Sequence, residues 1–166
     1  MGLLILLRHS KAEREHEAPS DRARALTGRG RSDAAAAAIA LREAAVTIGA
    51  VLASSAVRTR ETAGIVRDAL NLAAPVTLLD RLYLAEPDVI WAAARGAVGD
   101  GAMVVGHNPG LHALVASFID RSGDRSSLAR GFLQDFPTAA WAAFDADNDD
   151  LESVAPRFLG GWSPKI

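Results

Sequence analysis

The sequence predicts an α/β fold with a largely parallel sheet, because short aliphatic runs alternate with longer segments of helical character. The clearest strand is Leu3–Leu7, a continuous aliphatic run typical of a strand buried on both faces. The clearest helix is an alanine-rich segment from about Arg29 to Ala45, with Thr27 as a suitable cap. Strands that alternate with helices in this way favour parallel pairing.

The same alternation continues along the chain. We expect further strands at Ala50–Ala53, Val76–Leu79 and Ala102–Val105, and helices at Thr59–Leu70, Asp88–Ala97 and from Pro109 to about Ile119. Asn108 is placed as N-cap of the last helix, and Pro109 as its first residue. The polar segment Arg121–Arg130 is expected to be irregular. Closing strands are expected at Ala139–Phe144 and Leu151–Val154, around an acidic turn at Asp145–Asp150.

Length and composition exclude several classes of protein. A chain of 166 residues suits one domain, here residues 1–166. It has no cysteine, which excludes a disulfide framework, a cysteine-ligated metal site and a thiol nucleophile. A net charge of −2 gives no reason to expect a nucleic-acid partner. Leu3–Leu7 is too short for a membrane span or a signal-peptide core, so we expect a cytoplasmic protein without membrane association.

Cationic and imidazole side chains follow the first, second and fourth predicted strands. These residues are Arg8, His9, Arg58 and His107. Ligands of an open α/β sheet bind beyond the carboxyl ends of its strands, so we expect the four side chains to meet at one edge of the sheet. Their coincidence at strand ends is a stronger signal than any one of them.

This combination of residue types suits a phosphoryl group. A guanidinium presents a planar fork of donors that matches phosphate oxygens. A neutral imidazole can attack phosphorus and hold it covalently, and fixed cations then stabilise the charge on the transferred group. Arg58 begins a predicted helix, where a cation opposes the helix dipole, and this placement makes more sense beside an anion. His107 likewise precedes a helix N-terminus, which is itself an anion site.

Each residue taken alone has a simpler interpretation. Arg8 and His9 could form a polar strand end, His107 could be a turn histidine bonded to backbone, and Arg58 a solvated helix end. A metal site at His9 and His107 is a further alternative, but no HxH or HExxH spacing supports it. We therefore expect neither a metal ion nor a cofactor.

Five stretches of the chain resemble the histidine phosphatase superfamily, with the phosphoglycerate mutase-like fold, and most closely its small SixA-type phosphohistidine phosphatase branch. The stretches are Leu4–Ala12 (LILLRHSKA), Arg24–Gly30 (RALTGRG), Ser54–Ala63 (SSAVRTRETA), Val105–Leu111 (VGHNPGL) and Phe136–Ala143. They span nearly the whole chain. The resemblance implies a three-layer α/β/α sandwich with a mostly parallel sheet.

The resemblance also implies roles for individual residues. His9 would be the nucleophile that becomes phosphorylated, and Arg8, Arg58 and His107 would complete the phosphate site. Ser10 and Asn108 are adjacent and could add donors to the phosphate. Ser10 stands where the common family motif has glycine, which should be tolerated if that residue needs no positive φ.

The general acid is the second departure from the family pattern. Larger members place a Glu or Asp after the third strand, and Glu86 and Asp88 lie in that region. Glu86 is the candidate acid, although it could equally be a helix-start residue that the dipole favours. Hydrolysis of a phosphohistidine releases an imidazole, a better leaving group than an alkoxide, so an acid is not required there.

These observations predict a metal-independent phosphatase that acts through a phosphohistidine on His9. Its partner would be a phosphorylated protein, dephosphorylated at phosphohistidine, or a small phosphate ester. A phosphomutase is one alternative, which the absence of a long lid-forming insertion disfavours. A non-catalytic phosphate- or phosphopeptide-binding module is the other. The oligomeric state is left open.

Overall fold

A central β-sheet organises the part of the chain that the computed structural model describes, residues 2–146 and 154–165. The strands are β1 (Leu3–Arg8), β2 (Ala50–Ser54), β3 (Val76–Leu79), β4 (Ala102–Gly106), β5 (Trp141–Asp145) and β6 (Arg157–Trp162). Their order across the sheet is β3-β2-β4-β1-β5-β6. β1, β2, β3 and β4 pair in parallel, whereas β5 pairs antiparallel with both β1 and β6.

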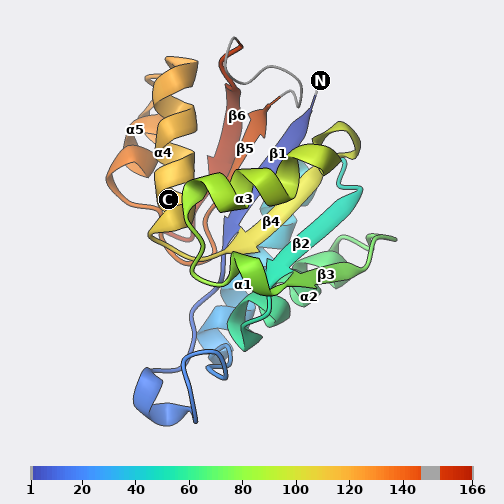
Figure 1. Cartoon of the computed structure of the whole chain (residues 1–166), viewed down its shortest axis with the longest axis vertical. Helices are drawn as coiled ribbons and strands as arrows, with labels where there is room; N and C mark the ends of the chain where they lie inside the picture. The colour runs from blue at the N-terminus through green and yellow to red at the C-terminus, as the bar shows by residue number, and fades with distance from the viewer. Residues whose placement is uncertain (1, 147–153, 166) are drawn as a thin grey trace.

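Helices cover both faces of this sheet (Figure 1). The α-helices are α1 (Gly28–Glu43), α2 (Val57–Ala69), α3 (Pro87–Ala94), α4 (Gly110–Ser122) and α5 (Ser127–Gln134). Short 3₁₀ helices lie at Glu15–Glu17, Asp80–Leu82 and Arg95–Asp100. One face of the sheet packs on α1 and α2, and the other on α3, α4 and α5. The predicted three-layer α/β/α sandwich with a mostly parallel sheet is confirmed.

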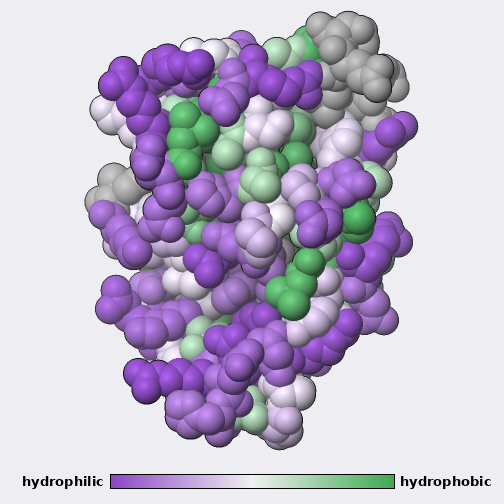
Figure 2. All heavy atoms as spheres, turned by 60° about the vertical axis from the view of Figure 1, so that its left-hand side comes forward, coloured by the Kyte–Doolittle hydropathy of each residue, from purple (hydrophilic) through white to green (hydrophobic). Residues whose placement is uncertain are grey.

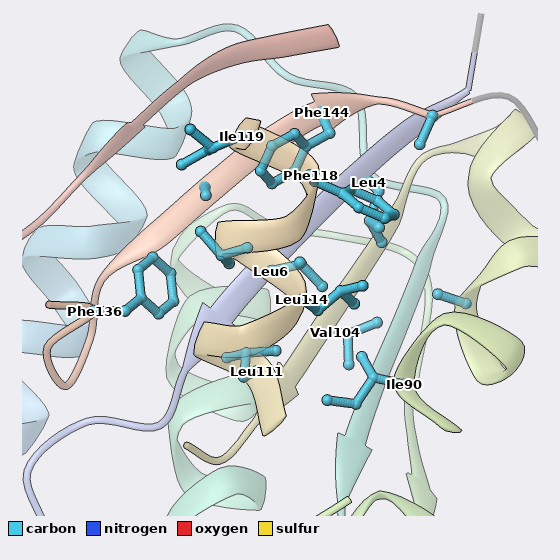
Figure 3. Close-up of a cluster of buried hydrophobic side chains, with 14 of the residues drawn as sticks. Leu4, Leu6, Ile90, Val104, Leu111, Leu114, Phe118, Ile119, Phe136 and Phe144 are labelled. Carbon is cyan, nitrogen blue, oxygen red and sulfur yellow. The ribbon is translucent and has the colours of Figure 1, made fainter. Parts of the chain in front are cut away.

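The central strand β1 separates two apolar clusters because its side chains alternate between the two faces. Leu4 and Leu6 pack with α3, α4 and α5, and Figure 3 shows this cluster around Phe118 and Phe144. Ile5 and Leu7 pack with α1 and α2 on the opposite face. All four side chains have no exposed surface, so β1 is fixed from both sides and its last residues are held rigidly.

The first helix begins as its sequence predicts. The Thr27 side chain accepts a hydrogen bond from the Gly30 backbone N–H at 3.0 Å, which makes Thr27 the cap of α1. A Cβ added to Gly30 would lie 2.0 Å from the Lys11 carbonyl oxygen, so this position requires glycine. The close contact places the start of α1 directly against the segment that follows β1.

The region around α4 and α5 departs from the prediction. α4 begins at Gly110 with Pro109 as N-cap, and Asn108 does not cap it. α4 also extends to Ser122 rather than Ile119, and Arg121–Arg130 is not irregular, because α5 begins within it. α5 forms because the Ser126 side chain caps it by accepting from the Ala129 N–H, while Ala129 and Phe132 are buried in the core.

The closing strands are shifted relative to the prediction. β5 begins at Trp141 rather than Ala139, and its partner β6 lies at Arg157–Trp162. Most of the predicted strand Leu151–Val154 and most of the predicted acidic turn lie outside the described residues. Val154 itself is described, and it lies in a bend before β6.

No helix among the described residues combines the length and the apolar character that crossing a membrane requires. The face drawn in Figure 2 is mostly hydrophilic, with separate small apolar patches.

Candidate active site

The carboxyl ends of the parallel strands bring the four residues predicted from strand ends to one edge of the sheet. Arg8 ends β1 and His9 follows it, His107 follows β4, and Arg58 lies in the first turn of α2 behind β2. The imidazole centroids of His9 and His107 are 5.3 Å apart. We call these four residues the strand-exit cluster.

His9 is oriented by the backbone on both sides. Its N–H donates to the Gly106 carbonyl at 3.1 Å, which ties the exit of β1 to the end of β4. Its ring Nδ1 lies 2.7 Å from the Ser10 carbonyl oxygen. A carbonyl only accepts, so Nδ1 carries the proton and the lone pair of a neutral ring is on Nε2. His9 therefore has the tautomer that a nucleophile requires.

His107 is held by a chain of hydroxyl groups at the end of β2. Its Nε2 lies 2.6 Å from Ser54 Oγ, which is 2.8 Å from Thr59 Oγ1. Thr59 in turn lies within hydrogen-bonding distance of carbonyl oxygens in its own turn. The ring is only 2% exposed, and its Nδ1 is buried without a partner.

Burial keeps both imidazoles neutral. Burial lowers the pKa of His9 to about 3, and the neighbouring His107, Arg58 and Arg8 lower it further against the opposing effect of the Ser10 carbonyl. Burial likewise lowers the pKa of His107 to about 4, with Arg58 the next largest cause. A neutral His9 retains its nucleophilic lone pair at neutral pH.

The two arginines are anchored at one part of the guanidinium and have an unpaired donor at another. Arg8 Nη1 donates to the Phe136 carbonyl at 3.2 Å. Arg58 is 3% exposed, and its Nη1 and Nη2 donate to the Asp21 carbonyl and carboxylate at 2.7 and 3.0 Å. The Nε atoms of both arginines are buried without a partner. With Nδ1 of His107 they form a set of buried nitrogens that an oxyanion could satisfy.

The remaining predicted site residues are placed differently. Ser10 is fully buried, and both of its donors are engaged: Oγ with the Gly30 carbonyl at 2.5 Å, and N–H with Thr62 Oγ1 at 3.0 Å. Asn108 Nδ2 donates to the Phe136 carbonyl at 2.9 Å, the same oxygen that Arg8 contacts. Its Oδ1, the atom with which a helix cap accepts a hydrogen bond, is buried without a partner, so Asn108 does not cap α4.

Glu86 lies apart from the strand-exit cluster in the hydrogen-bond network. It is exposed at the N-cap of α3, and its side chain makes no capping bond. No hydrogen bond or ion pair described for residues 2–146 joins its carboxylate to the cluster. The residue before it is nevertheless close to α4, because a Cβ added to Gly110 would lie 1.8 Å from the Ala85 carbonyl oxygen.

Two residues that sequence reasoning did not single out lie against the cluster. Asp21 contacts Arg58, and the Tyr83 ring packs nearly perpendicular to the His107 ring at a centroid distance of 5.4 Å. The one signal in the sequence that could have pointed to Tyr83 is that it is the only tyrosine. Asp21 lies in a polar segment that resembles an ordinary solvated loop, so the sequence contains no signal that distinguishes it.

Comparison with known proteins identifies the family. The model of the histidine phosphatase superfamily (branch 1) matches residues 4–83. An uncharacterised protein of Mycobacterium tuberculosis is 32% identical over 164 residues, covering 96% of this chain and 100% of the relative. One of Mycobacterium leprae is 32% identical over 145 residues, covering 84% and 86%. The chain belongs to the histidine phosphatase superfamily.

Solved structures support the same placement for this histidine phosphatase. A protein of Agrobacterium tumefaciens assigned as the phosphohistidine phosphatase SixA has a TM-score of 0.80 at 25% identity, covering 98% of each chain. The protein histidine phosphatase SixA in complex with tungstate has a TM-score of 0.77 at 25% identity, covering 98% of this chain and 97% of that one. The resemblance to the small SixA-type branch is confirmed.

The depressed pKa values of this histidine phosphatase lead to a testable titration. We expect the rings of His9 and His107 to stay neutral between about pH 8 and about pH 5 in the folded protein, as followed by long-range ¹H–¹⁵N NMR. In the urea-unfolded chain both should titrate near 6.5, the ordinary pKa of a histidine side chain.

As the pH falls, both histidines are protonated in the unfolded chain at a higher pH than in the folded protein. The two rings therefore lower the free energy of unfolding as the pH falls below about 6.5. Vanadate should raise both pKa values, because an anion stabilises the imidazolium form. A folded-state titration of either ring near pH 6.5 would contradict the burial argument.

Proposed function

We propose that this histidine phosphatase hydrolyses a phosphoryl group through a covalent intermediate on His9, with protein phosphohistidine as its preferred substrate class. One observation carries the proposal. Arg8 Nε, Arg58 Nε and His107 Nδ1 are buried without partners around a histidine whose Nε2 lone pair is free. Such an arrangement suits a tetrahedral oxyanion attacked by an imidazole.

The proposed reaction has two steps. In the first, the lone pair of His9 Nε2 forms the P–N bond while the bond from phosphorus to the leaving group breaks. The leaving group takes up a proton, from Glu86 where it is an alkoxide and from solvent water where it is an imidazole. In the second, water attacks phosphorus and the P–N bond breaks, which returns the electron pair to Nε2 and releases inorganic phosphate. Arg8, Arg58 and His107 hold the phosphoryl oxygens in both steps, so the proposal requires no metal ion.

The position of Glu86 bears on the substrate class. If the leaving group is an alkoxide it needs a proton donor, and Glu86 is the proposed donor. Its exposed carboxylate has no described bond that would direct it to the strand-exit cluster. An imidazole leaves far more easily than an alkoxide, since its conjugate acid has a pKa of about 6.5. This difference favours phosphohistidine, on a phosphorylated protein met in the cytoplasm.

A comparison of leaving groups tests the proposal. We expect the protein to hydrolyse a phosphohistidine-carrying protein with a kcat/KM at least about 100-fold above that for an alkyl phosphate such as glycerol phosphate. We expect Glu86→Gln to slow the alkyl ester by about 10-fold or more, and the phosphohistidine substrate by a smaller factor. Released phosphate is the measured product.

Other outcomes would point elsewhere. A preference for alkyl phosphates would assign a small-ester phosphatase. Transfer of phosphate to an added glycerate or sugar would assign a mutase. Tight binding of the phosphoprotein without phosphate release would assign a binding module. Equal effects of Glu86→Gln on both substrates would remove Glu86 from the acid role.

A further inference from the structure

Asp21 joins Arg24 of its own segment to two side chains from other parts of the fold, Arg58 of α2 and Tyr83. Its Oδ1 accepts from Arg24 Nη1 at 3.0 Å, and its Oδ2 accepts from Arg58 Nη2 at 3.0 Å. The hydroxyl of Tyr83 donates to the same Oδ2. The backbone carbonyl of Asp21 accepts a further bond from Arg58 Nη1 at 2.7 Å. One residue in an irregular segment therefore holds both terminal nitrogens of a buried arginine.

The Asp21 segment is itself anchored by the residues that follow Asp21. The carbonyl of Arg22 accepts from the Val57 N–H at 2.9 Å, which attaches the segment to the first residue of α2. Arg24 Nε donates to the Glu13 carbonyl at 2.6 Å. Asp21 is consequently placed by contacts of its neighbours Arg22 and Arg24 as well as by its own bonds to Arg58.

These contacts set the direction in which Arg58 presents its remaining donor. A guanidinium is planar and rigid, so fixing Nη1 and Nη2 also fixes the Nε–H bond. That Nε is the buried, unpartnered nitrogen of the strand-exit cluster. The Asp21 carboxylate also balances the charge of an arginine that is only 3% exposed.

Through its contact with Tyr83, Asp21 also affects the position of His107. The Tyr83 hydroxyl donates to Asp21, and the Tyr83 and His107 rings lie nearly perpendicular, with their centroids 5.4 Å apart. The guanidinium of Arg22 lies 4.1 Å above the Tyr83 ring centroid and closes the outer side of that ring. Tyr83 thus packs between Asp21, Arg22 and His107.

We propose that Asp21 is a positioning residue for phosphoryl transfer, acting through Arg58 and Tyr83 and not through contact with the substrate. The inference rests on the proposed function, because it assigns a purpose to the Nε donor of Arg58. Donors that are fixed before the reaction favour the transition state over the ground state. Loss of Asp21 should therefore affect kcat and transition-state binding more than it affects binding of phosphate.

Asp21→Asn and Asp21→Glu test the proposal with an aryl phosphate as substrate. Asparagine keeps the shape and removes the charge, whereas glutamate keeps the charge and displaces the carboxylate. We expect each to lower kcat by about 10- to 50-fold and to weaken vanadate inhibition by a similar factor. Inhibition by inorganic phosphate should change by less than about threefold, since a ground-state oxyanion tolerates a loosely held donor. Tyr83→Phe should show the same pattern at a smaller amplitude.

The controls separate this inference from the proposed function. Asp33→Asn removes the carboxylate of the Arg29–Asp33 ion pair on α1 and should leave kcat and vanadate inhibition unchanged. If the Asn variant does not fold, the Glu variant carries the same test. A wild-type protein without hydrolysis and without phosphate trapped on His9 would overturn the proposed function. Two outcomes with an active wild type would overturn only the role of Asp21 and leave the proposed function standing. In one, the folded Asp21 variants have an unchanged kcat; in the other, inhibition by phosphate and inhibition by vanadate are weakened equally.

Discussion

Replacing His9 with alanine should abolish phosphate release and phosphoenzyme formation together. No other described imidazole in the cluster has a free Nε2, because Nε2 of His107 is occupied by Ser54 Oγ at 2.6 Å. Removal of a covalent nucleophile costs about 10⁴-fold or more in kcat in other enzymes that form covalent intermediates. We expect a loss of at least about 10³-fold, the smaller figure allowing for slow attack by water on the bound substrate.

The measurement combines steady-state hydrolysis with trapping of the phosphoenzyme, whose stability is then compared in acid and in base. A radiolabelled phosphoryl group on histidine survives base and is lost in acid, which distinguishes it from a serine ester. His16→Ala is a matched control, because His16 is exposed in the 3₁₀ helix at Glu15–Glu17. If the His9→Ala protein still became labelled, the nucleophile would be a residue other than His9.

Replacing Arg58 with lysine should be the next most damaging change, although it conserves the charge. The guanidinium of Arg58 makes two bonds to Asp21 and keeps Nε available. A lysine ammonium is a compact point charge on a flexible stem, so it cannot bond to Asp21 and also present a fixed donor to the phosphoryl group. Loss of one fixed oxyanion donor typically costs about 10²- to 10³-fold in kcat, and we expect a loss in that range.

The Arg58 experiment needs a stability measurement beside the kinetics. Thermal unfolding of Arg58→Lys should show a folded protein, since the lysine ammonium can still pair with the half-buried carboxylate of Asp21. Arg60→Lys, two residues further along α2 and exposed, should behave as wild type in both assays. A kcat within about threefold of wild type for Arg58→Lys would show that charge alone suffices, against the argument from the fixed fork.

Much of the fold could be predicted because it depends on local and periodic signals. The aliphatic run at Leu3–Leu7 leaves no polar face, so it predicts a strand covered on both sides, and β1 is that strand. The strand at Val76–Leu79 has the predicted bounds. Parallel pairing then brings the strand ends together, which is why Arg8, His9, Arg58 and His107 could be grouped before any contact was known.

The features that could not be predicted depend on contacts between distant segments. The polar character of Arg121–Arg130 conceals the start of α5, which is stabilised by the Ser126 cap and by burial of Ala129 and Phe132. Asn108 has the sequence signature of a helix cap, but its amide instead bonds to the Phe136 carbonyl, 28 residues away. Asp21 acquires its partners only when the fold brings α2 and Tyr83 beside it.

The Phe136 carbonyl has a consequence for how such a protein tolerates change. This oxygen accepts from Arg8 of β1 and from Asn108 after β4, and it belongs to the peptide backbone. No substitution of a side chain can delete a main-chain acceptor, but the Phe136 side chain is fully buried in the core, so a substitution there would act on both strand exits by displacing the backbone that carries this oxygen. The neighbouring Asp135 is exposed, and its carboxylate favours the charged form of Arg8, so diversification at residue 135 would reach the same strand exit through charge while leaving the main-chain acceptor in place.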